Sequence, residues 1–123
     1  MAADDPGRQP FAGTCEVAIH SGGPGGTIGP VPANKRWVVE TISVMATIPP
    51  GGTIYMMQFD TPGFSMWLAP TQVPDGLFGL RHYVANSALR FYVEPGNSVQ
   101  FSAYVGEATA ETLCFISGYL LDV

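Results

Sequence analysis

The chain is short of charged residues, and cations are the scarcest. Only 12% of its 123 residues are Asp, Glu, Lys or Arg, against a usual share of roughly 25%. Lys35 is its single lysine, and ten carboxylates against five Lys and Arg residues give a formal net charge of -5 at pH 7. A protein that tracks phosphates needs the opposite balance. We therefore expect neither a nucleic-acid partner nor binding to an anionic membrane.

Long apolar runs are also missing, although 46% of the residues are hydrophobic. No run approaches the roughly 18 residues that a transmembrane helix needs, so we expect no membrane insertion. The first residues include Asp4 and Asp5 and lack the apolar segment of a signal peptide. Two interpretations stay open: an intracellular or virion protein that starts at Met1, and a secreted protein whose signal has been removed.

Residues for metal binding and catalysis are few. The two histidines, His20 and His82, lie on separate segments without the H-x-H pair of cupins, so we expect no metal and no cofactor. Segment 63–67 (Gly-Phe-Ser-Met-Trp) misses the G-x-S-x-G pattern of a nucleophile elbow at its last position. Segment 22–29 lacks the third glycine of a dinucleotide-binding motif and the lysine of a P-loop. No residue is predicted to be catalytic, which makes an enzyme the least favoured class.

The two cysteines, Cys15 and Cys114, fall in the first and the last strand-like segments. Terminal strands of a β-sandwich are often neighbours, so a disulfide between these residues is feasible. It would close a loop of about 100 residues, worth roughly 4–5 kcal/mol in the chain-entropy model. The alternative is two buried free thiols, which are common in protein cores.

What the chain does contain is a series of short alternating segments separated by turns rich in Pro and Gly. This pattern is typical of an all-β protein, and no long segment has the 3.6-residue period of a helix. We predict strands at 14–20, 36–48, 53–59, 64–69, 80–85, 89–94, 98–105 and 112–121. About eight strands predict a single-domain antiparallel β-sandwich, with a jelly roll favoured over an immunoglobulin-type Greek key. Residues 1–13 are predicted to form an extended arm and residues 14–123 the sandwich domain.

The short strands, the Pro-Gly turns and the terminal segment 117–123 resemble small bacterial or phage jelly-roll proteins. The resemblance implies the fold alone and carries over no functional residue.

Several predicted strands are apolar on both faces, whereas a two-layer sandwich buries one face of each sheet. Either a long loop such as 70–79 or another subunit must cover the second apolar face. We predict a homo-oligomer, with a trimer as the first expectation by analogy with other jelly rolls. The predicted interface residues are Tyr55, Met57, Phe59, Phe64, Met66, Phe115 and Tyr119.

Residues for binding are better supplied than residues for catalysis. Sugar sites combine an aromatic face with polar groups, often on loops. The candidates for such a site are Asp60, Trp67, Arg81, Tyr83, Asn86, Arg90, Tyr92 and Tyr104. We also predict that 89–94 and 98–105 form one hairpin, which would place Arg90, Tyr92, Gln100, Ser102 and Tyr104 on one face. The alternative is an ordinary solvent-exposed cross-strand ladder.

These observations predict a non-enzymatic β-sandwich subunit that assembles with itself and acts as a structural or surface-binding module. Its predicted location is extracellular or on a virion. Two alternatives stay open. One is a lectin-like module with a glycan as its partner, and the other is a small jelly-roll enzyme with a site at a subunit boundary.

Overall fold

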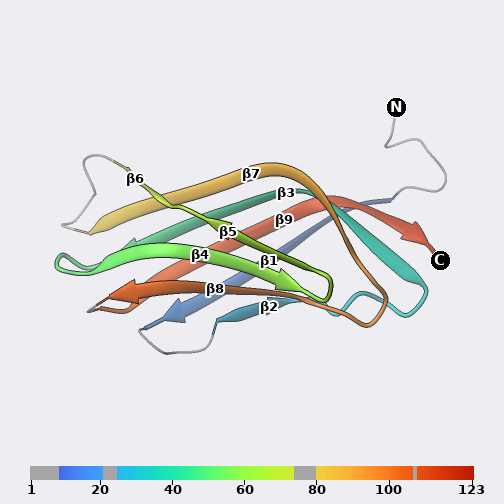
Figure 1. Ribbon diagram of the computed structural model, residues 1–123, viewed down its shortest axis with the longest axis horizontal. Helices are drawn as coiled ribbons and strands as arrows, with labels where there is room; N and C mark the ends of the chain where they lie inside the picture. Colours follow the sequence, from blue (N-terminus) through green and yellow to red (C-terminus); the bar gives the residue numbers. More distant parts are fainter. Residues whose placement is uncertain (1–8, 21–24, 74–79, 107) are drawn as a thin grey trace.

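The protein is described by a computed structural model that covers residues 9–20, 25–73, 80–106 and 108–123. Its strands form two antiparallel sheets that pack face to face (Figure 1). The five-stranded sheet has the order β1-β9-β3-β7-β6, and the four-stranded sheet has the order β2-β8-β4-β5. The strands are β1 (Gln9–Ile19), β2 (Gly26–Ile28), β3 (Lys35–Ile48), β4 (Thr53–Thr61), β5 (Phe64–Leu68), β6 (Thr71–Val73), β7 (Arg81–Val93), β8 (Val99–Gly106) and β9 (Ala110–Asp122). The predicted all-β sandwich is confirmed.

The strand pairing is that of a chain folded in half. β1 pairs with β9, β2 with β8, β3 with β7 and β4 with β5, and every pair is antiparallel. A folded ribbon of this kind, rolled into two sheets, is a jelly roll. The predicted topology is therefore present, with β6 added beside β7. The two three-residue strands, β2 and β6, lie in segments that we expected to be loops.

The predicted hairpin between 89–94 and 98–105 is wrong. The first segment belongs to β7, which is continuous over residues 81–93 in the five-stranded sheet, and the second is β8 in the four-stranded sheet. The turn between them crosses from one sheet to the other, where the amide of Gly96 donates to the carbonyl of Val31 at 2.9 Å. Each of the two strands needs one buried face. Two strands that pack face to face in different sheets meet this need as well as two strands that are hydrogen-bonded in one sheet.

The first strand begins at Gln9, which is earlier than the predicted start at Thr14. Residues 9–13 of the expected arm therefore pair with β9. The ring of Phe11 stacks on that of Trp37, with centroids 4.8 Å apart, which holds this end of β1 on the sheet. Residues 1–8 lie outside the described residues.

β3 contains a bulge at Glu40, because Val39 lies opposite Gly118 and Thr41 opposite Ser117. The extra residue changes which alternate positions face the core, as a bulge does. Val39 and Ile42 both face inward as a result. Val38 lies on the other side of the strand, opposite Tyr119, and has no exposed surface. Gly118 is needed at the bulge, since a Cβ there would lie 1.9 Å from the carbonyl oxygen of Val38.

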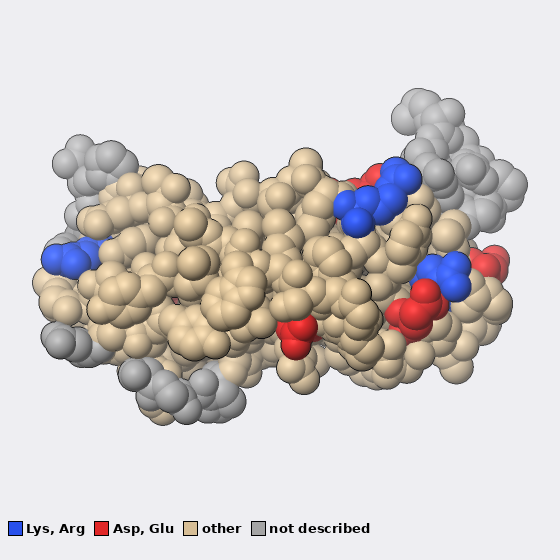
Figure 2. Space-filling model, viewed as in Figure 1, with Lys and Arg blue, Asp and Glu red and all other residues tan. Residues whose placement is uncertain are grey.

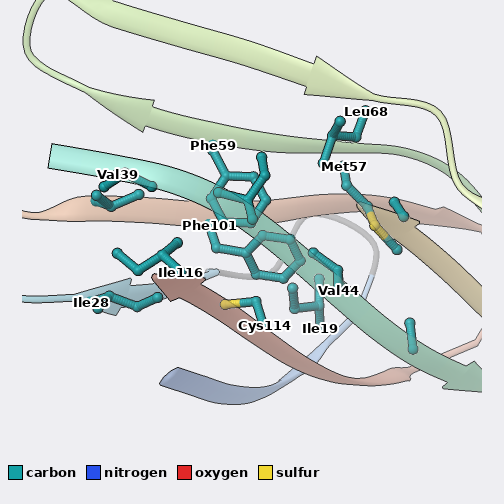
Figure 3. Close-up of a cluster of buried hydrophobic side chains, with 14 of the residues drawn as sticks. Ile19, Ile28, Val39, Val44, Met57, Phe59, Leu68, Phe101, Cys114 and Ile116 are labelled. Carbon is teal, nitrogen blue, oxygen red and sulfur yellow. The ribbon is translucent and has the colours of Figure 1, made fainter. Parts of the chain in front are cut away.

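β4 contains a second bulge, at Tyr55, between the pairs Ile54–Val105 and Met56–Tyr104. Tyr55 is 64% exposed, whereas Met57 and Phe59 have no exposed surface and lie in the core (Figure 3). We had predicted all three at an interface because simple alternation puts them on one face. The bulge separates Tyr55 from the other two.

The remaining predicted interface residues also divide between core and surface. Phe64 packs against the core and stacks on Phe91 with ring centroids 4.4 Å apart, and Met66 packs against the same core. Tyr119 is 8% exposed, whereas Phe115 is 38% exposed. Of the predicted interface residues, Tyr55 and Phe115 are thus the ones with large exposed surfaces.

The two phenylalanines at the centre of the core provide the first prediction. Phe59 contacts Phe101 with ring centroids 5.2 Å apart. Phe59→Ala is expected to lower the free energy of unfolding by about 3–5 kcal/mol, because it leaves a cavity. Tyr55→Ala, four residues earlier on the same strand, should cost about 0.5 kcal/mol or less. Urea unfolding measures both, and similar losses in the two variants would contradict the bulge.

Candidate functional site

The outward face of the four-stranded sheet carries two cross-strand rows of polar side chains. In the first row, Asp60 lies between Ser65 on β5 and Gln100 on β8, and Gln100 lies opposite Thr27 on β2. In the second row, Gln58 lies between Trp67 and Ser102. The strand period of two places these residues on one face. The Nε2 of Gln58 donates to the Oγ of Ser65 at 3.2 Å, which connects the two rows.

Aromatic side chains adjoin these polar rows. Trp67 on β5 and Tyr104 on β8 stack across β4, with ring centroids 5.4 Å apart and an interplanar angle of 18°. They are 51% and 52% exposed. Tyr55 lies against the backbone of Gly106, where a Cβ would be 2.9 Å from its hydroxyl oxygen. We call the set Tyr55, Gln58, Asp60, Trp67, Gln100 and Tyr104 the aromatic-polar face.

Two hollows open beside the aromatic-polar face, and Asp60 and Gln100 line both of them. One has a volume of about 550 Å³ and also includes residues 61–63 and 96–98. The other has a volume of about 330 Å³ and also includes Gln58, Ser102 and the glycines at 25 and 26. Within the described chain, neither hollow is lined by Lys or Arg.

The outward face of the five-stranded sheet has a different character. Leu113, Met45 and Val84 lie side by side on β9, β3 and β7. Met45 is 54% exposed, and Phe115 and Val73 are each 38% exposed. We call Met45, Val73, Val84, Leu113 and Phe115 the apolar row. A hollow of about 530 Å³ lies over it, lined also by Glu16, His82 and Glu111.

The cations of the described residues are all engaged. Arg36 pairs with Glu94 at 2.9 Å, Arg90 pairs with Glu40 at 3.3 Å, and Lys35 pairs with Asp122. Arg81 donates to the carbonyl of Gly52 at 3.1 Å. The hydrogen bond to Glu40 is the main cause that raises the pKa of Arg90. In Figure 2, charged side chains of both signs gather toward the right-hand end of the face in view, and few lie in its middle.

The structure divides the predicted sugar-binding residues between the two sheets. Asp60, Trp67 and Tyr104 come together on the aromatic-polar face. The other five, namely Arg81, Tyr83, Asn86, Arg90 and Tyr92, all lie on β7 in the five-stranded sheet. The incorrect hairpin is the reason for this difference.

Not all of the β7 candidates are accessible, and the aromatic-polar face has a member that we did not predict. Tyr83 is only 6% exposed. Gln58 is the member that we did not predict, whereas we expected Gln100 on the face of the incorrect hairpin together with Tyr104, and Tyr55 at the subunit interface. Alternation from Asp60 could have indicated Gln58, but nothing in the sequence marks the bulge that turns Tyr55 outward.

Cys15 and Cys114 lie directly opposite each other on β1 and β9. Opposite residues of an antiparallel pair have Cα atoms about 4.5–5.5 Å apart, which suits a disulfide. Both are free thiols in the structure. Gly26 packs over Cys15, since a Cβ at Gly26 would lie 1.9 Å from its Sγ. The disulfide stays a prediction.

The described residues offer neither a metal site nor a helix that could span a membrane. Among the described residues, no three His, Cys, Asp or Glu side chains are grouped so that they could hold a metal ion. The same residues include no helix that is long and apolar enough to cross a membrane.

The Cys114 thiol provides a pH-dependent prediction. Burial, followed by the neighbouring Cys15, raises its pKa from 9.0 to about 12. The folded state therefore keeps a proton that the unfolded chain loses, so this contribution to stability is complete below pH 9 and is lost as pH rises toward 12.

The test compares reduced wild-type protein with Cys114→Ala. The other titrating groups are present in both proteins, so their effects on the pH dependence of stability cancel in the difference. The difference in unfolding free energy between them should be smaller at about pH 10.5 than at about pH 8. An equal difference at both pH values would contradict the burial of the thiol.

Comparisons with protein-family models and with curated proteins give no match for this chain. A similar chain among solved structures belongs to the cyanophage Pam1 capsid asymmetric unit, with a TM-score of 0.58. The similarity covers 94% of this chain and 87% of that chain, at 12% sequence identity. At this identity, the similarity shows a shared β-sandwich fold.

Proposed function

We propose that this chain is a structural subunit of a virus particle, in which it assembles with further copies of itself. The observation that carries the proposal is the similarity in fold to a chain from a cyanophage capsid asymmetric unit, over 94% of this chain and 87% of that one. The coverage of both chains means that the comparison involves whole domains and not one shared hairpin. Fold does not determine function, so the surfaces must provide the remaining support.

The apolar row supports the self-assembly part of this proposal. It crosses β9, β3, β7 and β6, on a face that no other described element of the chain covers. Contiguous exposed apolar surface usually marks a site of interaction. The ion pairs of Arg36 and Arg90 lie elsewhere, beside Glu94 and Glu40. A contact at the apolar row therefore leaves those two ion pairs in water, and Glu16 and Glu111, which line the same hollow, would lie at its margin.

We assign a second copy of the chain as the partner that covers the apolar row, because symmetric homo-oligomers are the commonest soluble assemblies. A trimer remains the first expectation for their number. The location that accompanies this function is the virion, and no observation favours a secreted protein outside a particle.

Self-assembly is tested by the molar mass in solution, measured by light scattering. The wild-type protein should have a defined mass that is a multiple of the 13.1 kDa chain. Met45→Glu should shift it to the monomer, because an unpaired carboxylate in a dry contact costs several kcal/mol. Ser65→Glu, which adds the same charge on the opposite sheet, should keep the oligomer. A monomeric wild type, or an unchanged Met45→Glu variant, would refute this interface.

The virion part of the proposal needs a separate measurement. Antibodies against the purified chain, used for immunogold electron microscopy, should label virus particles released from the cells that make the chain. Preimmune serum provides the control. Chain that stays in the supernatant while the sedimented particles carry no label would overturn the assignment.

A further inference from the structure

We propose that the aromatic-polar face binds a neutral saccharide chain. The ligand would pack the C–H faces of its sugar rings on the uncovered faces of the Trp67 and Tyr104 rings, and its hydroxyl groups would bond to Gln58, Asp60 and Gln100. This inference goes beyond the proposed structural role, and the two concern opposite faces of the molecule.

Two exposed aromatic rings give the aromatic-polar face its apolar surface. Trp67 is 51% exposed, whereas the other tryptophan, Trp37, is 8% exposed. The stack with Tyr104 covers one face of each ring and leaves apolar surface in contact with water. Aromatic faces carry negative charge density, which attracts weakly positive C–H groups. A sugar ring presents such C–H groups on one side.

The polar rows supply hydrogen-bond partners for the hydroxyl groups of a sugar. Gln58 lies directly between Trp67 and Ser102. Asp60 and Gln100 lie in the next row, which is roughly 7 Å along the strands at about 3.4 Å per residue. Glutamine amides both donate and accept hydrogen bonds, as hydroxyl groups do. One ligand on the aromatic stack can therefore reach both rows.

The charge of the residues that line the two hollows decides which ligands fit. Asp60 is the single ionisable residue that lines the two hollows within the described chain. The described Lys and Arg residues are engaged elsewhere, as shown above. A phosphate, sulfate or uronic acid would meet a carboxylate and no described cation, which is unfavourable. These charges favour a neutral, hydroxyl-rich ligand over a nucleic acid or an anionic glycan.

The side chains of the aromatic-polar face are held in place by the strands and by one another. All six members lie on strands, namely β4, β5 and β8. Gln58 is held by Ser65, the Trp67 and Tyr104 rings hold each other, and Tyr55 rests on Gly106. Side chains that are already ordered lose less conformational entropy on binding.

The test is affinity electrophoresis of the full chain in native gels that contain dextran, amylose, galactomannan or β-glucan. At least one of these neutral polysaccharides should retard the wild-type protein. Trp67→Ala and Tyr104→Ala should each weaken binding about tenfold or more. Tyr92→Ala is the matched control, because Tyr92 is 50% exposed on the other sheet, and it should bind like the wild type.

Further variants separate lost binding from lost folding. Circular dichroism and thermal unfolding verify each fold, and Trp67→Phe should recover part of the binding that Trp67→Ala loses. Gln58→Leu keeps the shape of the side chain, removes the amide and should also weaken binding. Dextran sulfate should retard the wild-type protein no more than it retards Trp67→Ala, because the anionic polysaccharide should not use the site.

The outcomes separate this inference from the self-assembly proposal. If both hold, Met45→Glu should be monomeric and still bind a polysaccharide, and Trp67→Ala should keep the oligomer mass and lose binding. No retardation of folded wild-type protein by any of the four polysaccharides would overturn the saccharide site. Loss of the oligomer in Trp67→Ala would also overturn it, since the face would then be a protein interface.

Discussion

The pairing of the two ends of the chain is the constraint on which the rest of the structure depends. β1 and β9 form a continuous antiparallel ladder from Gln9 opposite Leu120 to Ile19 opposite Ala110. Once these ends are joined, the chain is folded in half, and the other pairs follow from the outside toward the β4–β5 turn. Contacts this distant in sequence have a large loop-closure cost. The core between the sheets, with Phe59 and Phe101 at its centre, offsets that cost.

Two bulges then determine what each sheet presents to its surroundings. The extra residue at Glu40 brings Val39 and Ile42 to the same side of β3, and the ion pair of Glu40 with Arg90 forms on the outward side. The extra residue at Tyr55 turns that ring outward while Met57 points into the core. Because a strand has a period of two, one inserted residue exchanges the faces of everything that follows it.

The two outward faces consequently have different chemistry within one small domain. The five-stranded sheet presents aliphatic and thioether groups, which gain most from contact with another apolar surface. The four-stranded sheet presents paired aromatic rings beside amides and one carboxylate, which suit a ligand with both C–H and O–H groups. In the roles proposed above, the first face would contact a second copy of the chain and the second face a neutral saccharide.

The sequence alone determined the fold class, because alternating apolar residues and Pro-Gly turns depend on local physics that any strand obeys. The net charge of -5 also led us to expect no nucleic-acid partner, since charge is counted without knowing a structure. It placed Asp60, Trp67 and Tyr104 among the binding candidates, and it placed Cys15 and Cys114 on the first and the last strands.

Only the tertiary structure decided which strands are hydrogen-bonded and which are packed face to face. A four-residue turn such as 94–97 serves a hairpin and a crossing between sheets equally well, so Tyr92 and Tyr104 could not be separated in advance. The bulges were equally hidden, because an extra residue in one strand is defined only against its partner. Met57, Phe59 and Tyr55 alternate regularly in the sequence, and their division between core and surface comes from the register with β8.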